Sequence, residues 1–187
     1  MRKLSASLFM SLDGVVDSPQ DWHFPYMDDQ MMAAVIGSMA STDTILLGRV
    51  TFQEWASYWP QQAGDGGMAD HINATMKYVV STTLEEVDWD NSTVVDGDIA
   101  ATVAQLKDSG GKDISVTGSG TLVRSLLELD LVDELHLMLH PVVVGRGKRL
   151  FNEGSGPKGL GLVASETFAS GVLNLRYAPE ASGGGAA

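Results

Sequence analysis

The sequence predicts an α/β fold with a mixed central sheet, an antiparallel C-terminal edge and helices on both faces. Short apolar runs alternate with helix-like segments from the N-terminus to Leu129, which is the pattern of strands joined by crossover helices. From Glu134 onward, strand-like segments follow one another with no helix between them, which is typical of antiparallel pairing. The chain has 187 residues, enough for a single domain with a substantial core.

The first half of the chain supplies two strand–helix pairs. Residues 3–10 are predicted to form a strand that ends in Ser-Leu-Asp-Gly. The segment 28–40 is predicted to be helical because its apolar residues recur at helical spacing. The apolar run 44–47 is typical of a buried strand, and residues 50–57 can form the helix that follows it.

The second half supplies two further helices and most of the strands. One helix is expected at 98–108, where Asp98 is an N-cap and Gly110-Gly111 a stop signal, and another at 122–129. The expected strands are 77–81, 93–95, 114–117, 134–140, 162–168 and 172–177. The last two would pair as a hairpin. No linker or repeat interrupts the pattern, so we expect one domain over residues 1–178 and a disordered Gly/Ala-rich tail over 179–187.

Composition excludes several classes of function. The net charge of −12 argues against a nucleic-acid partner, whose phosphates need clustered lysines and arginines. No segment approaches the apolar length of a membrane span, and the N-terminus lacks a secretory signal, so a cytoplasmic location is expected. The absence of cysteine excludes disulfides and thiolate metal sites. No metal site is predicted: His136 and His140 have the spacing of a helical metal-binding pair, but they lie on a predicted strand, so two core or edge histidines are expected instead.

Two glycine-containing turns follow buried strands and open helices. One is Gly118-Ser119-Gly120, whose third dinucleotide-fingerprint glycine would fall at Val123, so the Rossmann spacing fails. The other is Leu47-Gly48-Arg49-Val50-Thr51, where a cation and a hydroxyl stand at the start of a helix. A phosphate at such a turn gains free helix N–H groups and the Arg49 guanidinium. Together the two turns suit an extended ligand with separated phosphates, although each could also be a tight packing turn.

These segments resemble the dihydrofolate reductase superfamily, and most closely stand-alone proteins similar to the reductase domain of riboflavin biosynthesis. The matching segments are SLDGVV, LLGRVTFQEW, KYVVST, the strand–GSGTLV–helix unit and LHPVVVGRGKRLF, which are spread over residues 3–178. The resemblance implies a dihydrofolate reductase-like three-layer sandwich and NADPH as the cofactor.

The resemblance also implies which residues bind that cofactor. The contacts expected at the two turns and their flanks are Leu47, Gly48, Arg49, Thr51, Gly118, Ser119, Gly120, Thr121 and Leu122. Ser81 and Thr82 would match the hydroxyls near the adenosine 2′-phosphate. Family members are often dimers, which predicts a homodimer with the apolar segment 140–144 as a candidate for pairing between chains.

Two carboxylates are candidates for the catalytic proton source. Asp13 in the SLDG turn sits where the family's first strand meets the pocket, although Asp-Gly is also a common turn pair. Asp28 follows a stretch that resembles the one leading to the acidic pterin-binding residue of dihydrofolate reductases, with a spacing one residue longer. Alternatively, Asp28 is the N-cap of its helix.

The expected substrate is a small heterocycle. Trp22, Trp55 and Trp59 are the candidate aromatic walls, and Trp55 and Trp59 are equally compatible with a place in the core. Riboflavin-pathway reductases usually carry a D-D-P-x-L motif for the ribose-phosphate substrate, and this chain reads TFQEWASYWPQQ in that region. We therefore predict an NADPH-dependent reductase of a pteridine, pyrimidine or similar carbonyl- or imine-bearing heterocycle. The alternatives are the 5-amino-6-(5-phosphoribosylamino)uracil reductase step and a non-catalytic NADP(H)-sensing module.

Overall fold

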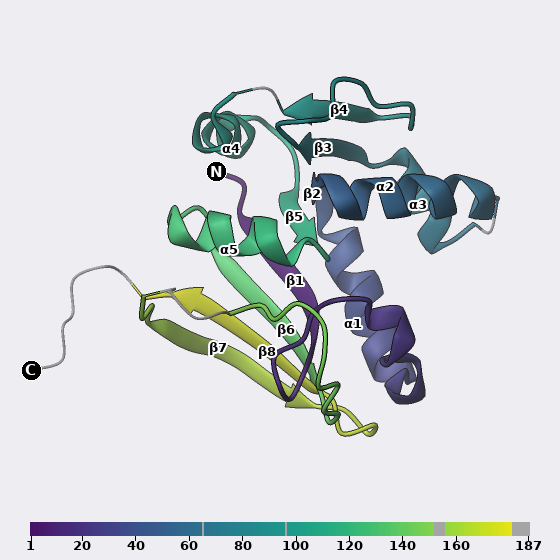
Figure 1. The fold of residues 1–187 in the computed structure, drawn as a ribbon, viewed down its shortest axis with the longest axis vertical. Helices are drawn as coiled ribbons and strands as arrows, with labels where there is room; N and C mark the ends of the chain where they lie inside the picture. The colour runs from purple at the N-terminus through teal and green to yellow at the C-terminus, as the bar shows by residue number, and fades with distance from the viewer. Residues whose placement is uncertain (65, 96, 152–155, 181–187) are drawn as a thin grey trace, which may run out of the picture.

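One mixed sheet forms the centre of the computed structural model, which describes residues 1–64, 66–95, 97–151 and 156–180 (Figure 1). Its strand order is β4-β3-β2-β5-β1-β6-β8-β7. The strands are β1 (Leu4–Ser11), β2 (Thr42–Gly48), β3 (Met76–Val80), β4 (Ser92–Val95), β5 (Asp113–Thr117), β6 (Glu134–His140), β7 (Leu160–Thr167) and β8 (Leu173–Pro179). Strands β1 to β6 pair in parallel, whereas β8 is antiparallel to both β6 and β7. The predicted α/β class and antiparallel C-terminal edge are confirmed.

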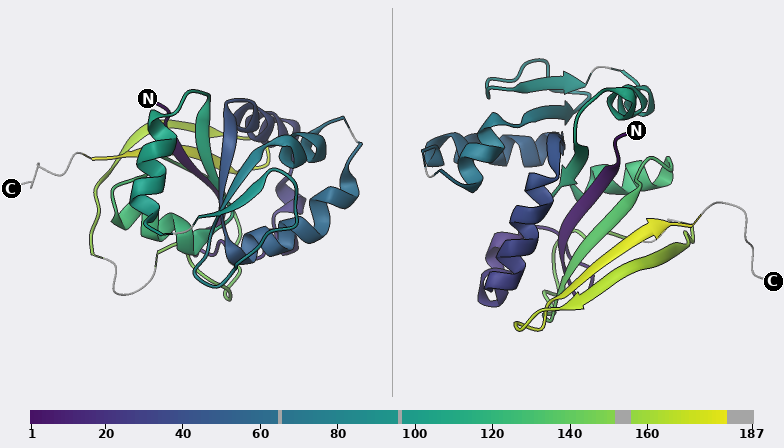
Figure 2. Two further views of the ribbon diagram at one scale, coloured as in Figure 1. Left: turned by 90° about the horizontal axis from the view of Figure 1, so that it is seen from above. Right: turned by 180° about the vertical axis from the view of Figure 1, so that it is seen from behind.

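Helices cover both faces of the sheet (Figure 2). Helices α1 (Asp29–Ala40), α2 (Arg49–Tyr58) and α3 (Met68–Ala74) lie on one face, and α4 (Ile99–Asp108) and α5 (Gly120–Glu128) on the other. Short 3-10 turns at Pro19–Asp21, Phe24–Tyr26 and Trp59–Gln62 complete the described helical segments. The layers form because each helix buries one apolar face against the sheet.

Two apolar clusters fill the space between the layers. Under α4 and α5, buried side chains of β1, β5 and β6 pack against Val103, Leu122 and Leu126. Under α2 and α3, the second cluster joins Leu47 and Phe52 to other buried residues of β2, β3 and α3. Apolar packing therefore covers β1, β5 and β6 toward α4 and α5, and β2 and β3 toward α2 and α3.

Two features differ from the sequence expectation. Helix α3 was not predicted, because its seven residues are too few to show a period and only Ala69 and Ile72 are buried. Strand β8 continues to Pro179, and the Glu180 N–H donates to the Gly159 carbonyl at 3.1 Å, so the sheet reaches into the segment assigned to the tail. Residues 181–187 of that predicted tail lie outside the described residues.

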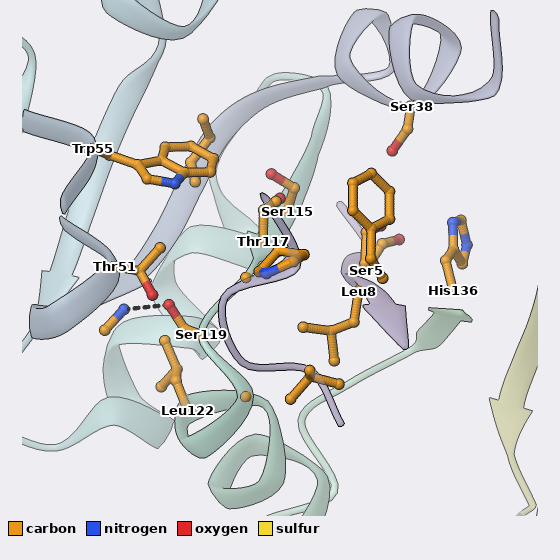
Figure 3. A pocket seen from close by; sticks show the side chains of 18 of the residues that line it. Ser5, Leu8, Ser38, Thr51, Trp55, Ser115, Thr117, Ser119, Leu122 and His136 are labelled. Atoms are coloured by element: carbon orange, nitrogen blue, oxygen red, sulfur yellow. Dashed lines mark hydrogen bonds between the residues drawn. The ribbon is translucent and has the colours of Figure 1, made fainter. Parts of the chain in front are cut away.

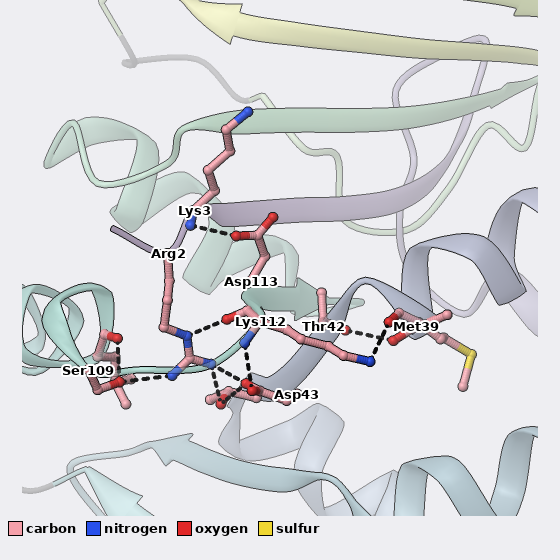
Figure 4. A network of polar contacts seen from close by, with 11 residues as sticks. Arg2, Lys3, Met39, Thr42, Asp43, Ser109, Lys112 and Asp113 are labelled. Atoms are coloured by element: carbon pink, nitrogen blue, oxygen red, sulfur yellow. Dashed lines mark hydrogen bonds and ion pairs between the residues drawn. The ribbon is translucent and has the colours of Figure 1, made fainter.

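A polar network fastens the amino-terminal edge of the sheet (Figure 4). The buried Arg2 guanidinium donates to Ser109 Oγ at 2.9 Å and to Thr44 Oγ1 at 2.7 Å, and it also pairs with Asp43. The Lys112 N–H donates to the same Asp43 carboxylate at 2.8 Å. This network joins the chain start, β2 and the turn before β5 at the edge opposite the glycine turns, which leaves the carboxyl edge open for a ligand site.

The carboxyl edge brings the two glycine turns together. Strands β2 and β5 are neighbours, with Leu46 opposite Val116, so the turns after Gly48 and Thr117 emerge side by side. Strand β1 pairs with the other side of β5. Ligands of open α/β sheets bind at this edge. No helix among the described residues has the length and apolar character needed to cross a membrane.

Candidate functional site

The two glycine turns are in direct contact. The Gly48 N–H donates to Ser119 Oγ at 2.9 Å. A Cβ at Gly48 would lie 3.4 Å from the Ser119 side chain, and one at Gly118, where φ is +74°, would lie 3.3 Å from Thr51 Cγ2. A side chain at Gly118 would be strained, because φ near +74° disfavours any residue with a Cβ. The sequence placed these turns at strand ends, and the fold joins them into one surface.

The helices that start at these turns have no side-chain caps. In the described part of the chain, neither the N-cap residue Gly48 of α2 nor Ser119 of α5 accepts a side-chain hydrogen bond from the first turn of its helix. Helices α1 and α4, by contrast, are capped by Asp28 and Asp98. The first N–H groups of a helix need an acceptor, and an anion supplies one. The starts of α2 and α5 are therefore suited to bind phosphate.

A long cleft runs from these turns along the sheet (Figure 3). Thr51, Trp55 and Ser119 stand at one end, and Ser38 and His136 at the other, with strand residues between them. The predicted site residues that line the cleft are Gly48, Arg49, Thr51, Trp55, Trp59, Ser81, Thr82, Gly118, Ser119, Gly120, Thr121 and Leu122. The cleft therefore brings three of the predicted strand-end segments into one surface.

Exposed cations stand at the glycine-turn end of the cleft. Arg49 donates to Gln53 Oε1 at 2.9 Å and forms no ion pair with any described residue. Lys148 is exposed and lines the cleft, and its carbonyl accepts from the N–H of Val16, the residue that lies against Gly120. Arg149 lies near them, and its guanidinium is 3.3 Å from the Asp13 carboxylate. Arg49 and Lys148 are therefore placed to pair with a ligand phosphate.

Ser81 closes a turn at the end of β3. Its Oγ accepts from the Thr83 N–H at 3.1 Å and from the Leu84 N–H at 3.0 Å. Thr82 is exposed beside it on the cleft. The turn presents hydroxyl groups at the third strand end, in line with the two glycine turns.

Asp13 holds a neighbouring loop in place. Its carboxylate accepts from Ser11 Oγ at 2.7 Å and from the N–H groups of Val144 and Gly145 at 3.0 and 2.9 Å. The Ser11 hydroxyl and these backbone donors hold the pKa of Asp13 well below its usual range. Asp13 is not among the described residues that line the cleft. These contacts favour the turn interpretation over a proton donor.

Asp28 caps helix α1. Its carboxylate accepts from the Met31 N–H at 2.8 Å and from the Ser170 N–H at 3.0 Å. The Met31 donor is the main reason that its pKa is lowered. Asp28 does not appear among the described cleft-lining residues either. Of the two interpretations left open by the sequence, the structure has the helix cap.

Two other predicted site residues are in the interior. Leu47 is fully buried and packs with Phe52 below the glycine turn. Trp22 is buried, donates from Nε1 to the Asp17 carbonyl at 3.1 Å and packs edge-on against His140. Neither residue is among the described lining of the cleft. Both residues therefore belong to the packed interior next to the cleft and not to its lining.

Several cleft residues were missed by the sequence interpretation. The segment 16–20 lines the cleft, and so do hydroxyl side chains in the middle of β1 and β5. A Cβ at Gly120 would lie 2.9 Å from Val16 Cγ2, so this segment closes directly over the second glycine turn. Ser5 and Ser7 alternate with Leu4, Ala6 and Leu8, and this alternation is a signal that could have marked one strand face as polar.

Metal ligands do not converge in the described part of the chain, where no group of three or more histidine or acidic side chains could hold an ion. His140 is fully buried. His136 is part-exposed, with its Nε2 3.0 Å from Glu134.

Comparison with known proteins gives a consistent result. Residues 2–174 match the family described as the RibD C-terminal domain. An uncharacterized protein of Bacillus subtilis, YyaP, is 33% identical over 182 residues that cover 94% of each chain. A putative riboflavin biosynthesis protein from Shewanella superposes with a TM-score of 0.74 at 21% identity, covering 96% of this chain and 99% of the other. A pyrimidine reductase-like protein from Corynebacterium diphtheriae gives a TM-score of 0.69 at 16% identity, with 97% and 93% covered.

Proposed function

This chain belongs to the RibD C-terminal domain family, a family of riboflavin-biosynthesis-type reductase domains with the dihydrofolate reductase-like fold, and we propose that it is an NADPH-dependent reductase of a small heterocycle. The observation that carries the proposal is the contact between the two glycine turns, where Gly48 donates to Ser119 beside two helix starts without side-chain caps. Such a pair of turns supplies two neighbouring sets of N–H donors, which suits a ligand with more than one phosphate.

The residues at the turns fit a dinucleotide phosphate. Gly48 and Gly118 keep the surface free of Cβ atoms where a pyrophosphate would approach, and Arg49 and Lys148 add positive charge at the same end. Thr51 adds a hydroxyl at the start of α2. Thr82, on the β3 turn, stands where a further phosphate on the adenosine ribose could bind. Preference for NADPH over NADH rests on this last contact.

The protein's contribution to the reaction is positional. NADPH, when bound, supplies the hydride. The glycine turns would hold its phosphates, Trp55 offers an aromatic wall for a flat substrate, and segment 16–20 excludes water by covering the second turn. No side chain is needed as a covalent nucleophile.

Neither of the two predicted proton donors is among the described residues that line the cleft. Asp13 and Asp28 were predicted for this role, and that role stays a prediction. Their carboxylates hold backbone N–H groups and are not among the described residues lining the cleft. We therefore propose that the proton reaches the reduced centre from a water molecule in the cleft.

Two other functions are each favoured by a specific observation. The match to the RibD C-terminal domain favours the 5-amino-6-(5-phosphoribosylamino)uracil reductase step. Both candidate carboxylates accept hydrogen bonds from within the protein, Asp13 from the Ser11 hydroxyl and Asp28 from the Met31 N–H. This use of both carboxylates in the fold favours a non-catalytic NADP(H)-sensing module. Turnover separates the sensor from an enzyme: no NADPH oxidation with any pterin, flavin precursor or simple carbonyl, while NADPH still binds, would establish the sensor.

Cofactor binding is tested through Arg49. NADPH is expected to raise the melting temperature and to quench tryptophan fluorescence, since Trp55 and Trp59 line the cleft. Arg49→Ala should weaken NADPH binding about tenfold or more, because a hydrogen bond to a charged group contributes about 1.5–3 kcal/mol. Fluorescence titration with NADPH, NADH and flavins measures this change.

Arg146→Ala is the matched control. Arg146 is an exposed arginine that is not among the described lining residues of the cleft, so its removal should leave NADPH affinity unchanged. Equal NADPH affinity in Arg49→Ala and the parent protein would show that the phosphate assignment is wrong.

A further inference from the structure

The two faces of the central strands differ in chemistry. Toward α4 and α5, strands β1, β5 and β6 present only apolar side chains, which are Leu4, Ala6, Leu8, Ile114, Val116, Leu135 and Leu137. Toward α1, the same strands present Ser5, Ser7, Ser115, Thr117 and His136, and beyond them the apolar Phe9 and Met138. Central strands of a parallel sheet are normally apolar on both faces. The face toward α1 is therefore arranged to meet polar groups.

Strand register places these polar side chains side by side. Ser5 is opposite Ser115, and Ser7 is opposite both Thr117 on β5 and His136 on β6. We call Ser5, Ser7, Ser115 and Thr117 the hydroxyl floor. It begins at Thr117, the residue before the Gly118 turn, and runs along the cleft away from that turn (Figure 3). A ligand on this floor would lie next to whatever occupies the glycine turns.

Polar atoms at the floor lack protein partners. Ser7 Oγ is buried and has no hydrogen-bond partner among the described residues. Ser115 is only 7% exposed and lines the cleft beside Ser5. His23, 6% exposed at the cleft wall, has a buried Nδ1 with no hydrogen-bond partner among the described residues. Buried polar groups are normally satisfied, so Ser7 Oγ and His23 Nδ1 indicate a hydrogen-bonding ligand.

The floor carries little charge of its own. Arg49, Arg124, Lys148 and Arg149 line the cleft at the glycine turns or at the segments beside them. The remaining lining arginine, Arg176 on β8, has its Nε 3.9 Å from Glu134, and Glu166 lines the cleft nearby. A phosphate site would need an arginine or lysine that is not already balanced by carboxylates.

We propose that the hydroxyl floor binds an uncharged heterocycle with hydroxyl, amino or amide substituents and no phosphate group, stacked toward Trp55. This inference rests on the proposed function, because it assigns the glycine-turn end of the cleft to the cofactor. It also distinguishes this chain from a reductase of a ribose-phosphate substrate. Hydrogen bonds to Ser7, Ser115 and His23 set the orientation of the ring substituents.

Calorimetry with matched ligands tests the proposal. The probes are 5-amino-6-ribosylaminouracil and its 5′-phosphate, and a reduced pterin with a trihydroxypropyl chain and its phosphate, each titrated into protein saturated with NADP⁺. The unphosphorylated member of at least one pair is expected to bind, and its phosphate to bind about tenfold more weakly. Tighter binding of the phosphorylated members, or no binding of either unphosphorylated probe, overturns the proposal.

Variants of the floor provide the second arm. Ser7→Ala and Ser115→Ala should each weaken the unphosphorylated probe about fivefold or more and leave NADPH affinity unchanged. Ser92→Ala, on the distant strand β4, is the control and should change neither affinity. Unchanged probe affinity in both floor variants refutes the floor assignment. If the parent protein does not bind NADPH at all, the proposed function is refuted instead. Failure of the floor assignment can therefore be distinguished from failure of the proposed function.

Discussion

Two histidines are buried in an aromatic cluster beside the cleft. The rings of His23 and His140 are stacked with centroids 6.3 Å apart, and Phe9 lies 4.9 Å from the first and 5.5 Å from the second. Burial, and then the neighbouring His140, lower the pKa of His23 to about 4, and burial also lowers the pKa of His140. Both rings are therefore neutral at pH 7. The cluster packs against segment 16–20 through Trp22, whose Nε1 donates to the Asp17 carbonyl.

Acid should destabilise the protein through His23. Its pKa is about 4 in the folded chain and about 6.5 in an unfolded one, so the unfolded state binds more protons between these values. Stability is expected to fall as pH drops from about 6.5 to 4, by about 3 kcal/mol in total from this group. Urea unfolding at a series of pH values measures the change.

His23→Phe should flatten that dependence, because phenylalanine keeps the ring packing and cannot be protonated. His71→Gln, on α3 outside the cluster, is the control and should retain the parent slope. An unchanged slope between pH 6.5 and 4 in His23→Phe would show that His23 is not the titrating group.

At the scale of elements, four of the described helices differ in how they begin. Helices α1 and α4 begin at an aspartate whose carboxylate accepts from the first turn, and neither Asp28 nor Asp98 is among the described residues that line the cleft. Helices α2 and α5 begin at Gly48 and Ser119 without such a cap, and both starts line the cleft. A side-chain cap contributes about 1 kcal/mol. At α2 and α5 this contribution is absent, and a bound anion would supply acceptors in its place.

Substitution of Asp28 separates capping from proton donation. Asn caps a helix about as well as Asp but cannot donate a carboxylic proton, so Asp28→Asn should keep both stability and turnover. Asp28→Ala should lose about 1 kcal/mol of unfolding free energy because the cap is absent. Urea unfolding and NADPH oxidation with the best substrate of the panel give the two readouts. A hundredfold loss of turnover in Asp28→Asn at unchanged stability would restore the predicted catalytic role.

The whole molecule is organised around one carboxyl edge. The amino edge is closed by the buried Arg2 network, while the opposite edge gathers the strand ends that carry the glycine turns. The antiparallel hairpin of β7 and β8 extends the sheet beyond β6. The segment predicted to pair two chains, residues 140–144, is not a strand throughout, because β6 ends at His140 and the Leu12 N–H donates to the Val142 carbonyl at 2.9 Å.

The predicted homodimer is tested by light scattering. A dimer would have twice the 19.9 kDa mass of one chain. Val143 is the apolar side chain of that segment with the greatest exposure, at 69%. Val143→Glu should therefore shift the mass to that of a single chain, because a charge in the contact is costly to bury. Leu162→Glu on β7 is the control, and a mass that falls only in this control would place the contact on the hairpin instead.

Much of the fold was predictable from local pattern. Alternating apolar strands and amphipathic helices predicted the order of the elements, and the unbroken run of strands after Glu134 predicted the antiparallel edge. Helix α3 was missed because its seven residues carry no readable period. The glycine turns were predicted because, in each of them, the end of a strand, a glycine and the start of a helix follow one another within a few residues.

The amino-acid pattern alone therefore specifies most of the elements, the two glycine turns and the family to which they belong. Only the tertiary structure decided that Gly48 contacts Ser119, that Asp13 and Asp28 bind backbone N–H groups, and that Ser7 lies between Thr117 and His136. The physical reason is distance along the chain. Local periodicity specifies strands and helices, whereas the neighbours of a side chain across a sheet depend on strand order, which brings together residues more than a hundred positions apart.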